Sequence, residues 1–482
     1  MIETTELAPD LTVSRVLTAL WPLAGLDGNG ALPGPVLTAN ELIPRIEAGY
    51  TCFDTAEDPG SAEVITGLMR SAEAPRPKVQ ILAHWVPTPG TLSRQEVRKA
   101  VERILDRLKI DRLDLLQYHA WNYSDPVWLD SLFWLEELRD EGMIGHLGLN
   151  DFDAPHLSMA LASGITIRTN QICYSLLDQR AAADMRGICE HYGVKILAYG
   201  SLAGGLLSEN WLGKAEPKKG KLTGWALENY RRLIALAGDW SEFQNLLKVL
   251  NQVAEKHRVS IAAVSSRYVL DQPGFAGIIL GAGSDGLDSA QEYTPIFTTE
   301  LDRDDHDSIL RAQSHLDAAP GESVDECGKH PLLTAAGDSS IHPQTAKPVY
   351  PVIRKDNGKT KVLSGAVWEN IAGYCRATRS GRRILVSGTT AVHGERLIGG
   401  EDPAAQTHFV IDKIQAAIES LGGRLEDVDR TRIFVKDIRD WEQVTRVHGE
   451  RFGHIQPVTT LVQAKLIDEE YLVEIEAEAR VV

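Results

Sequence analysis

The chain has 482 residues, and its 50 basic and 67 acidic side chains give a formal net charge of −17 at pH 7. Apolar residues make up 43% of the chain and charged residues 24%, which is typical of globular proteins, and the length indicates two or three domains. The negative charge argues against a nucleic-acid partner and against docking on an anionic membrane, because both partners require a basic surface.

The cysteines and the N-terminal segment bear on the cellular compartment. The cysteines are odd in number and form no C-x-x-C pair, so neither a disulfide framework nor a thiolate zinc site is expected. The segment MIETTELAPDLTVSR is acidic and lacks the apolar core of a signal peptide. No stretch approaches the roughly 18 apolar residues of a membrane span. We therefore expect a cytoplasmic protein. The five cysteines are Cys52, Cys173, Cys189, Cys327 and Cys375.

Eight β-rich runs alternate with helical patterns in the first part of the chain. One helix is predicted to begin at Ser93, which has Glu96 at capping-box spacing, and another over 129–141 is predicted to end at Gly142. Eight strand–helix alternations predict a (β/α)8 TIM barrel, an α/β fold, and segment 203–245 is long enough to cover its mouth. The predicted strands are 15–21, 50–56, 79–86, 113–119, 144–150, 165–172, 194–200 and 276–282.

The composition changes at residues 316–348, which are rich in Pro, Gly, Ser and Ala and show no periodicity. We interpret this segment as a linker between a barrel domain, residues 1–315, and an α+β domain, residues 349–482. The final strand of the second domain alternates apolar and charged residues, as in LVEIEAEARVV. The elements predicted before it are a strand over 382–392, a helix from Asp402-Pro403, a strand over 431–438 and a helix over 440–452.

Three polar residues fall at the carboxyl ends of successive predicted barrel strands: Asp54, His84 and His119. In a (β/α)8 barrel the reactive groups lie at this end, so these side chains are predicted to meet in one pocket. A carboxylate beside an imidazole raises the pKa of the imidazole, and such a pair can donate or remove a proton. For a single residue of the three, a cap at a strand end would be the simpler interpretation.

Six segments follow one another in an order typical of a known family: GYTCFDTA, LDLLQYH, GMIGHLGLNDF, TNQICYSLLD, GVKILAYGSLAGGLLS and IILGA. On these segments, residues from about 12 to 315 resemble an aldo-keto reductase. The resemblance implies a barrel that binds a nicotinamide cofactor, usually NADPH, in an extended groove without a Rossmann motif. It also implies a catalytic Tyr, which is tuned by an Asp and a Lys and has a His nearby.

The resemblance carries over to the catalytic positions only in part. Asp54 matches the family aspartate and His119 the family histidine. The pattern D-T-A-x-x-Y-G has Pro59 at the position of the proton-donating Tyr, and His84 stands at the position of the Lys. A proline has no proton to donate, so the acid would be His84, His119 or a loop residue such as Tyr123.

The cofactor positions also match in part. Asn150 and Asp151 stand where the family usually has Ser-Asn, which with Gln171 would hold the carboxamide, and Tyr199 would stack on the nicotinamide ring. The segment after the eighth predicted strand, GAGSDGLDSAQEYTPIFTT, contains no Lys or Arg for a 2′-phosphate, so NADPH, NADH and no nucleotide all stay open. Backbone groups of Gly281, Gly283 and Ser284 are candidates for holding a pyrophosphate. The candidate substrate-binding residues are Trp21, Tyr123 and Tyr374.

A second set of segments, AGYCRAT, ILVSGTTA, TRIFVKDI and QPVTTLVQAKLIDEEYLVEIEAEA, covers residues from about 365 to 482. On these segments the C-terminal domain resembles the reactive-intermediate deaminase (Rid, YjgF-like) family. The resemblance implies a chorismate-mutase-like fold, a trimer with clefts between subunits, and hydrolysis of enamines or imines. Glu476 matches the glutamate that positions water and Tyr374 a pocket residue, whereas Thr459 replaces the carboxylate-binding Arg. Glu476 could equally be one of a row of solvated glutamates, and the domain could serve only for trimerisation.

Several hypotheses therefore remain open. The leading one is a bifunctional fusion protein acting on a small, nitrogenous carbonyl or imine substrate: a nicotinamide-dependent oxidoreductase with an altered catalytic tetrad, coupled to an imine deaminase. The alternative is a redox-silent acid–base lyase or hydrolase that uses Asp54, His84 and His119. A metal site formed by the same three residues is a third, although no ligand spacing within one element supports it. The last is a nucleotide sensor assembled, as a homo-oligomer, through its C-terminal domain.

Overall fold

The computed structural model describes most of the chain, and all structural statements below refer to these residues. The linker predicted over 316–348 lies largely outside them. The described residues are 2–20, 39, 42–55, 62–71, 78–87, 92–180, 184–218, 225–281, 290–318, 348–354 and 358–481.

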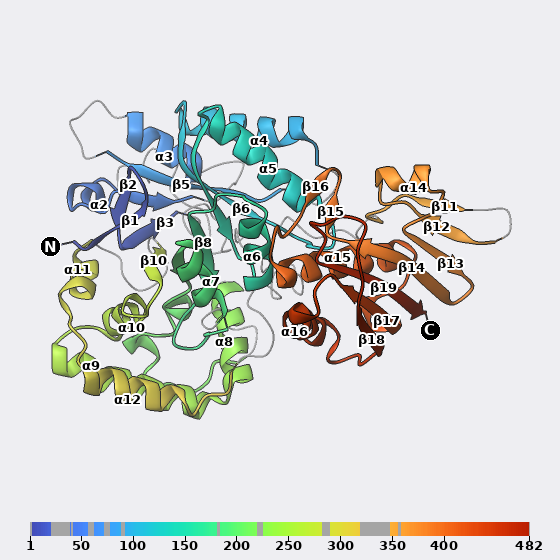
Figure 1. Cartoon of the computed structure of the whole chain (residues 1–482). Helices are drawn as coiled ribbons and strands as arrows, with labels where there is room; N and C mark the ends of the chain where they lie inside the picture. Colours follow the sequence, from blue (N-terminus) through green and yellow to red (C-terminus); the bar gives the residue numbers. More distant parts are fainter. Residues whose placement is uncertain are drawn as a thin grey trace.

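Eight parallel strands form a closed barrel in the N-terminal domain (Figure 1). Each strand pairs with the next along the chain, and β10 pairs with both β9 and β3, which closes the barrel. Their near-continuous burial is typical of parallel strands that are covered by helices outside and by side chains inside. The predicted (β/α)8 fold is confirmed. The strands are β3 (Val16–Ala19), β4 (Cys52–Asp54), β5 (Gln80–Trp85), β6 (Leu113–His119), β7 (Ile144–Asn150), β8 (Thr169–Cys173), β9 (Lys195–Tyr199) and β10 (Phe275–Gly281).

Helices surround the barrel, and their ends follow the local sequence. Ser93 caps α4 by accepting a hydrogen bond from the backbone N–H of Glu96, as its spacing predicts. Gly142 follows α5 with a φ of +89°, a conformation that favours glycine. The helices are α2 (Ile43–Glu47), α3 (Ala62–Ser71), α4 (Arg94–Leu108), α5 (Val127–Asp140), α6 (Ala154–Ala162), α7 (Asp184–Tyr192), α8 (Trp225–Ala237), α9 (Trp240–His257), α10 (Ile261–Leu270), α11 (Ala290–Thr298) and α12 (Arg303–Gln313).

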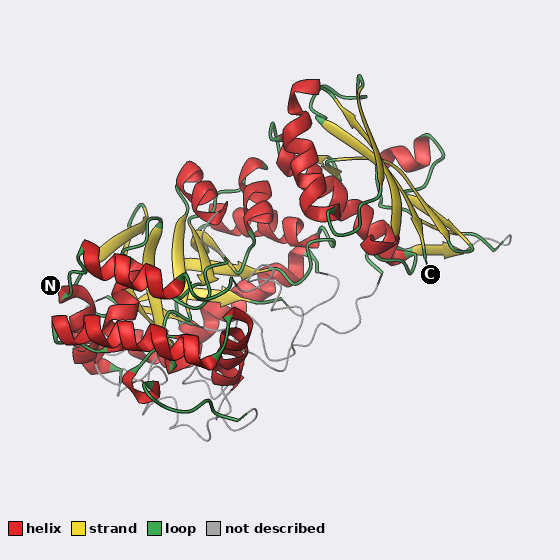
Figure 2. Ribbon diagram, turned by 90° about the horizontal axis from the view of Figure 1, so that it is seen from below, coloured by secondary structure: helices red, strands yellow, loops and turns green. Residues whose placement is uncertain are grey.

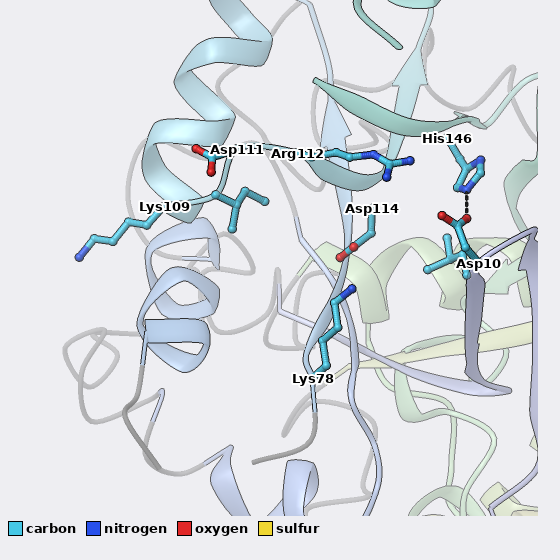
Figure 3. A pocket seen from close by; sticks show the side chains of 9 residues that line it. Asp10, Lys78, Lys109, Asp111, Arg112, Asp114 and His146 are labelled. Carbon is cyan, nitrogen blue, oxygen red and sulfur yellow. Dashed lines mark hydrogen bonds and ion pairs between the residues drawn. The ribbon is translucent and has the colours of Figure 1, made fainter. Parts of the chain in front are cut away.

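The amino end of the barrel is closed by a hairpin of β1 (Thr4–Ala8) and β2 (Leu11–Ser14). Leu7 and Leu11 of this hairpin pack in one core with the interior residues Leu17 and Leu115. Beside the hairpin turn lies a surface pocket of about 430 Å³ (Figure 3). This pocket is at the opposite end of the barrel from the strand termini that carry the predicted site. Its polar lining residues are Asp10, Lys78, Lys109, Asp111, Arg112, Asp114 and His146.

The C-terminal domain is a seven-stranded mixed sheet in the order β11-β12-β13-β14-β19-β17-β18, packed against α15 and α16. It confirms the predicted α+β domain, and Asp402 caps α15, with Pro403 at its first position, as predicted. The elements are β11 (Val352–Arg354), β12 (Thr360–Val362), α14 (Val367–Ile371), β13 (Ala377–Ser380), β14 (Arg383–Thr390), β15 (Val392–His393), β16 (Arg396–Leu397), α15 (Pro403–Ser420), β17 (Val428–Val435), α16 (Trp441–Phe452), β18 (Val458–Gln463) and β19 (Val473–Arg480).

The two domains are in contact, and α15 of the C-terminal domain packs against α6 of the barrel (Figure 1). In Figure 2, the two long helices of the C-terminal domain, α15 and α16, lie between its sheet and the barrel, so the other face of the sheet points away from the barrel. We call this face the open face.

Within the described part of the chain, no helix is both long enough and apolar enough to cross a membrane.

Candidate functional site

A layer of polar side chains, here called the polar layer, crosses the inside of the barrel near the carboxyl ends of the strands. Leu82 and Leu115 belong to the apolar interior of the barrel. His84 and Gln117 follow them by two positions and so point to the same side of their strands. The polar layer therefore lies on a packed apolar base, at the end of the barrel where the βα-loops begin. It consists of Asp54 of β4, His84 of β5, Gln117 of β6 and Gln171 of β8.

The polar layer is a buried hydrogen-bond network centred on Asp54. Nε2 of His84 lies 2.7 Å from Oδ1 of Asp54, and both side chains are buried. The amide nitrogen of Gln117 donates to Oδ1 of Asp54 over 3.1 Å and to the side-chain oxygen of Gln171 over 2.7 Å. It also lies 2.8 Å from Nε2 of His84. Because Asp54 accepts from the imidazole, Nδ1 of His84 is the remaining position at which a proton can be gained or released.

His119 lies one layer further toward the mouth of the barrel and is held in a defined tautomer. Its Nδ1 lies 3.1 Å from the backbone oxygen of Asn150, and since a carbonyl can only accept, Nδ1 carries the hydrogen. Burial lowers the pKa of His119 to about 4, and the nearby imidazole of His84 adds to this effect. The ring is therefore neutral at pH 7, and its Nε2 has a lone pair that can accept a hydrogen bond.

Several buried polar atoms around this layer have no partner among the residues that the structure describes: Nδ1 of His84, Nε2 of His119 and both polar atoms of the Asn150 side chain. Buried polar atoms of folded proteins are nearly always hydrogen-bonded, so these atoms mark a place for a further polar group. The free donor and free acceptor of Asn150 match those of a primary carboxamide. The chain thus fits a nicotinamide at this position.

The other predicted cofactor residues form hydrogen bonds within the barrel or end one of its strands. The hydroxyl of Tyr199 donates to the carboxylate of Asp151 over 3.0 Å, and Asp151 has a φ of +52°. Gln171 is part of the polar layer and donates to Oδ2 of Asp54 over 3.4 Å. Gly281 is the last residue of β10 and is buried. The structure therefore brings Gln171 to Asp54 and Gln117, and Tyr199 to Asp151.

Some predicted residues lie elsewhere. Trp21, Pro59, Gly283 and Ser284 lie outside the described residues. Tyr123 follows β6, but its ring stacks on His156 of α6 with the centroids 3.6 Å apart and an interplanar angle of 6°. The structure thus places Tyr123 at the contact with the C-terminal domain.

Segment 203–245, which was expected near the mouth, contains two short 3-10 turns followed by α8 and the first part of α9. Tyr230 of α8 packs with Cys173 and Leu206 in one core, and its hydroxyl lies 3.9 Å from Sγ of Cys173, the last residue of β8. Helix α8 is therefore anchored at the carboxyl end of β8.

Gln117 is a central member of the polar layer that the sequence analysis did not single out. Its position gave a usable indication, because it lies two residues before His119 in LDLLQYH and so must share its side of the strand. A glutamine on the inward side of an otherwise apolar barrel strand needs partners in the interior.

In the C-terminal domain, Glu476 of β19 lies on the open face and lines a pocket of about 360 Å³. Its carboxylate pairs with Arg432 of β17 at 2.9 Å. Thr459 instead pairs with Thr431, and the hydroxyl of Thr431 lies 2.9 Å from both the Thr459 hydroxyl and Nε2 of His448 of α16. Thr459 thus faces the helical side, whereas Glu476 faces the open side. The Tyr374 hydroxyl lies 3.4 Å from Nη2 of the buried Arg376.

Among the described residues, no group of three or more His, Cys, Asp or Glu side chains is placed to hold a metal ion.

The comparisons with known proteins agree with this architecture. A family model described as the aldo/keto reductase family matches residues 40–313, more than half of the chain, and the chain belongs to this family. The NADH-specific methylglyoxal reductase of Escherichia coli is 25% identical over 302 residues, which are 57% of this chain and 87% of that protein. The glycerol dehydrogenase of Gluconobacter oxydans shares the fold, with a TM-score of 0.54 and 22% identity over 65% of this chain and 95% of that one.

The C-terminal domain has relatives of its own. A family model described as endoribonuclease L-PSP matches residues 366–481. An uncharacterised protein of Streptomyces coelicolor is 41% identical over 120 residues, which are 25% of this chain and 90% of that protein. The chain is therefore an aldo/keto reductase barrel fused to a YjgF-like domain, as both resemblances implied.

Proposed function

We propose that the barrel is a nicotinamide-dependent oxidoreductase acting on a small carbonyl or imine. The observation that carries this proposal is that the Asp54–His84 pair and the unpartnered amide of Asn150 both lie at the carboxyl ends of the barrel strands. When bound, a nicotinamide supplies or takes up the hydride. The residues of this chain then have to bind, orient and exchange a proton with the substrate.

We assign Nδ1 of His84 as the atom that exchanges a proton with the substrate. Asp54 accepts from Nε2 and holds the ring in place, so Nδ1 can give a proton to the substrate oxygen or nitrogen and take it back in the reverse direction. His119 has its lone pair on Nε2 at neutral pH and so orients a substrate or product N–H or O–H by accepting from it. This division of roles needs no tyrosine at position 59.

We assign to Asn150 the binding of the nicotinamide carboxamide. The next residue in the chain, Asp151, forms a hydrogen-bonded pair with Tyr199. We favour NADH over NADPH, because the segment after β10 carries no cation for a 2′-phosphate. The NADH specificity named for the Escherichia coli relative is in keeping with this preference.

A nucleotide titration tests the proposal. Trp121 meets the His119 ring edge-on at 4.8 Å, so its fluorescence should report on the site. Saturable quenching by NADH, weaker quenching by NADPH, loss of most of the signal in Trp121→Phe and turnover of a panel of small aldehydes, ketones and imines are expected. A protein that binds neither nucleotide would contradict the proposal.

A redox-silent lyase or hydrolase is the second candidate. The observation in its favour is that Gln171 bonds to Gln117 and Asp54, rather than being free for a carboxamide. In this case Asp54, His84 and His119 would act alone as acid–base groups. Ammonia release from a nitrogenous substrate without any nucleotide response would select this candidate.

For the C-terminal domain we propose hydrolysis of an enamine or imine at the open face, with Glu476 positioning the water. The pocket that Glu476 lines is bordered by three arginines, Arg383, Arg430 and Arg432.

Apolar side chains such as Leu385 and Val462 are exposed on the sheet. We propose that further copies of the chain cover this face in a homo-oligomer, for which three subunits are the expected number. Light scattering on the purified protein measures that number directly, and a monomer would contradict it.

A further inference from the structure

The contact between the two domains is built around a buried imidazolium. His156 of α6 places Nδ1 2.6 Å from Oδ1 of Asp153 and Nε2 3.0 Å from Oδ2 of Asp412, which belongs to α15. Arg451 of α16 donates to the other oxygen of Asp412 over 2.7 Å. Both His156 and Asp412 are buried. Each ring nitrogen thus donates to a carboxylate, one from each domain.

Other close contacts between the two domains surround the His156–Asp412 interaction. The backbone N–H of Gly399 donates to Ser163 over 2.9 Å, and His393 lies 2.9 Å from the carboxylate of Asp130 of α5. At Gly400, a Cβ would come within 2.5 Å of the backbone oxygen of Ala162, so this approach requires glycine. The Arg396 guanidinium lies 4.1 Å from the ring centroid of Phe133. The contact is therefore extensive and leaves little room for sliding.

The same contact reaches the two loops that lead out of the candidate site. In the β6–α5 loop, residues 120–126, Trp121 packs on His119 while Tyr123 stacks on His156. Ser124 of this loop also donates to Glu419 of α15 over 3.4 Å. In the β7–α6 loop, residues 151–153, Asp151 accepts from Tyr199, and Asp153 is bonded to His156. Each loop is thus held by the site on one side and by His156 on the other.

We propose that His156 is a positioning residue through which the docked C-terminal domain holds the β6–α5 and β7–α6 loops against the candidate site. The C-terminal domain would then be a structural part of the barrel's active site as well as a domain with its own pocket. The inference rests on the proposed function only in that these two loops are taken to border a catalytic site.

Hydrogen–deuterium exchange of the full chain tests this without nucleotide or turnover. Asp412→Ala alters only the C-terminal domain, yet amides of residues 120–126 and 151–153 in the barrel should exchange about tenfold faster. Exchange in α9 and α10, on the other side of the barrel, should stay the same. Asp412→Glu keeps a carboxylate on His156 and should restore most of the protection. Asp429→Ala is the matched control, because Asp429 belongs to the same domain but forms an exposed pair with Arg480.

Two results would overturn the proposal. One is faster exchange along α6 and α15 with unchanged exchange in both loops. In that case His156 would only hold the two domains together and would not position the loops. The other is no change anywhere in Asp412→Ala. If Asp412→Ala unfolds the C-terminal domain, Gly400→Ala tests the same point by forcing the backbones apart at Ala162. Because no step needs nucleotide, failure here is distinguishable from failure of the proposed oxidoreductase.

Discussion

The imidazole of His84 and the carboxylate of Asp54 lie 2.7 Å apart at the ends of two neighbouring barrel strands, both buried. The sequence resemblance sets His84 at the position of the family lysine, and in this structure the imidazole is hydrogen-bonded to the aspartate. The proposed acid–base role of the pair depends on this contact.

Asp54→Asn should therefore lower turnover by at least about 100-fold, because general acid–base catalysis contributes about 10²- to 10⁴-fold. Nucleotide affinity, measured by tryptophan quenching, should change little. Asp10→Asn is the matched control, since Asp10 pairs with His146 at the amino end of the barrel, far from the site (Figure 3). Equal turnover of Asp54→Asn and wild type would remove Asp54 from the mechanism.

Gln117→Leu should lower kcat by about 10- to 100-fold, which corresponds to the roughly 1.5–3 kcal/mol of a hydrogen bond to a charged group. Leucine is similar in size but leaves Asp54 and Gln171 without the donor that now bridges them. Steady-state kinetics measure the effect, and circular dichroism checks the fold. Gln80→Leu, at the amino end of β5, is the control. If both variants lose the same activity, the polar layer has no special role.

The fold could be predicted from the sequence largely because barrel strands are short apolar runs of regular spacing. Asp54, His84 and His119 could be placed together because parallel strands end at one rim. Two features could not be predicted in this way. The carboxamide position depends on which polar atoms of Asn150 are left unpartnered, and the partner of His156 lies 256 positions away across a linker. Local periodicity carries no information about either.

His156 should make the domain contact dependent on pH. Burial alone would lower its pKa, but the carboxylates of Asp153 and Asp412 outweigh this effect and raise the pKa to about 9. A raised folded-state pKa gives stability that is fully present below the unfolded value of about 6.5 and is lost as the pH rises through about 9. This stabilisation of the folded protein by protonated His156 amounts to roughly 3 kcal/mol at low pH. The other titratable groups close to the ring are Arg451 and His408. Burial lowers the pKa of His408 to about 4, so its imidazole is neutral over this pH range.

Urea unfolding of wild type and His156→Gln at pH 6, 7.5 and 9.5 measures this contribution as a difference. The difference is needed because burial lowers the pKa of Lys413 in α15 to about 7. Its contribution to the free energy of unfolding therefore increases as the pH rises above about 7. The two effects oppose one another between about pH 7 and 9. The loss caused by His156→Gln should be largest at pH 6 and smallest at pH 9.5. A difference that is constant with pH would contradict a charged His156.

Glu476→Gln should abolish enamine or imine hydrolysis by the C-terminal domain and leave nucleotide quenching in the barrel unchanged. The amide keeps the shape of the side chain but cannot hold water as a carboxylate does. The open face of the sheet, which carries Glu476, points away from the barrel (Figure 2). Glu478→Gln is the matched control on the same face of β19, where the carboxylate pairs with Arg383 at 2.8 Å. Ammonia release from a freshly generated imine is the measurement. Unchanged release in Glu476→Gln, with the oligomeric state the same as in wild type, would mean that Glu476 is a solvated residue and that the domain serves assembly alone.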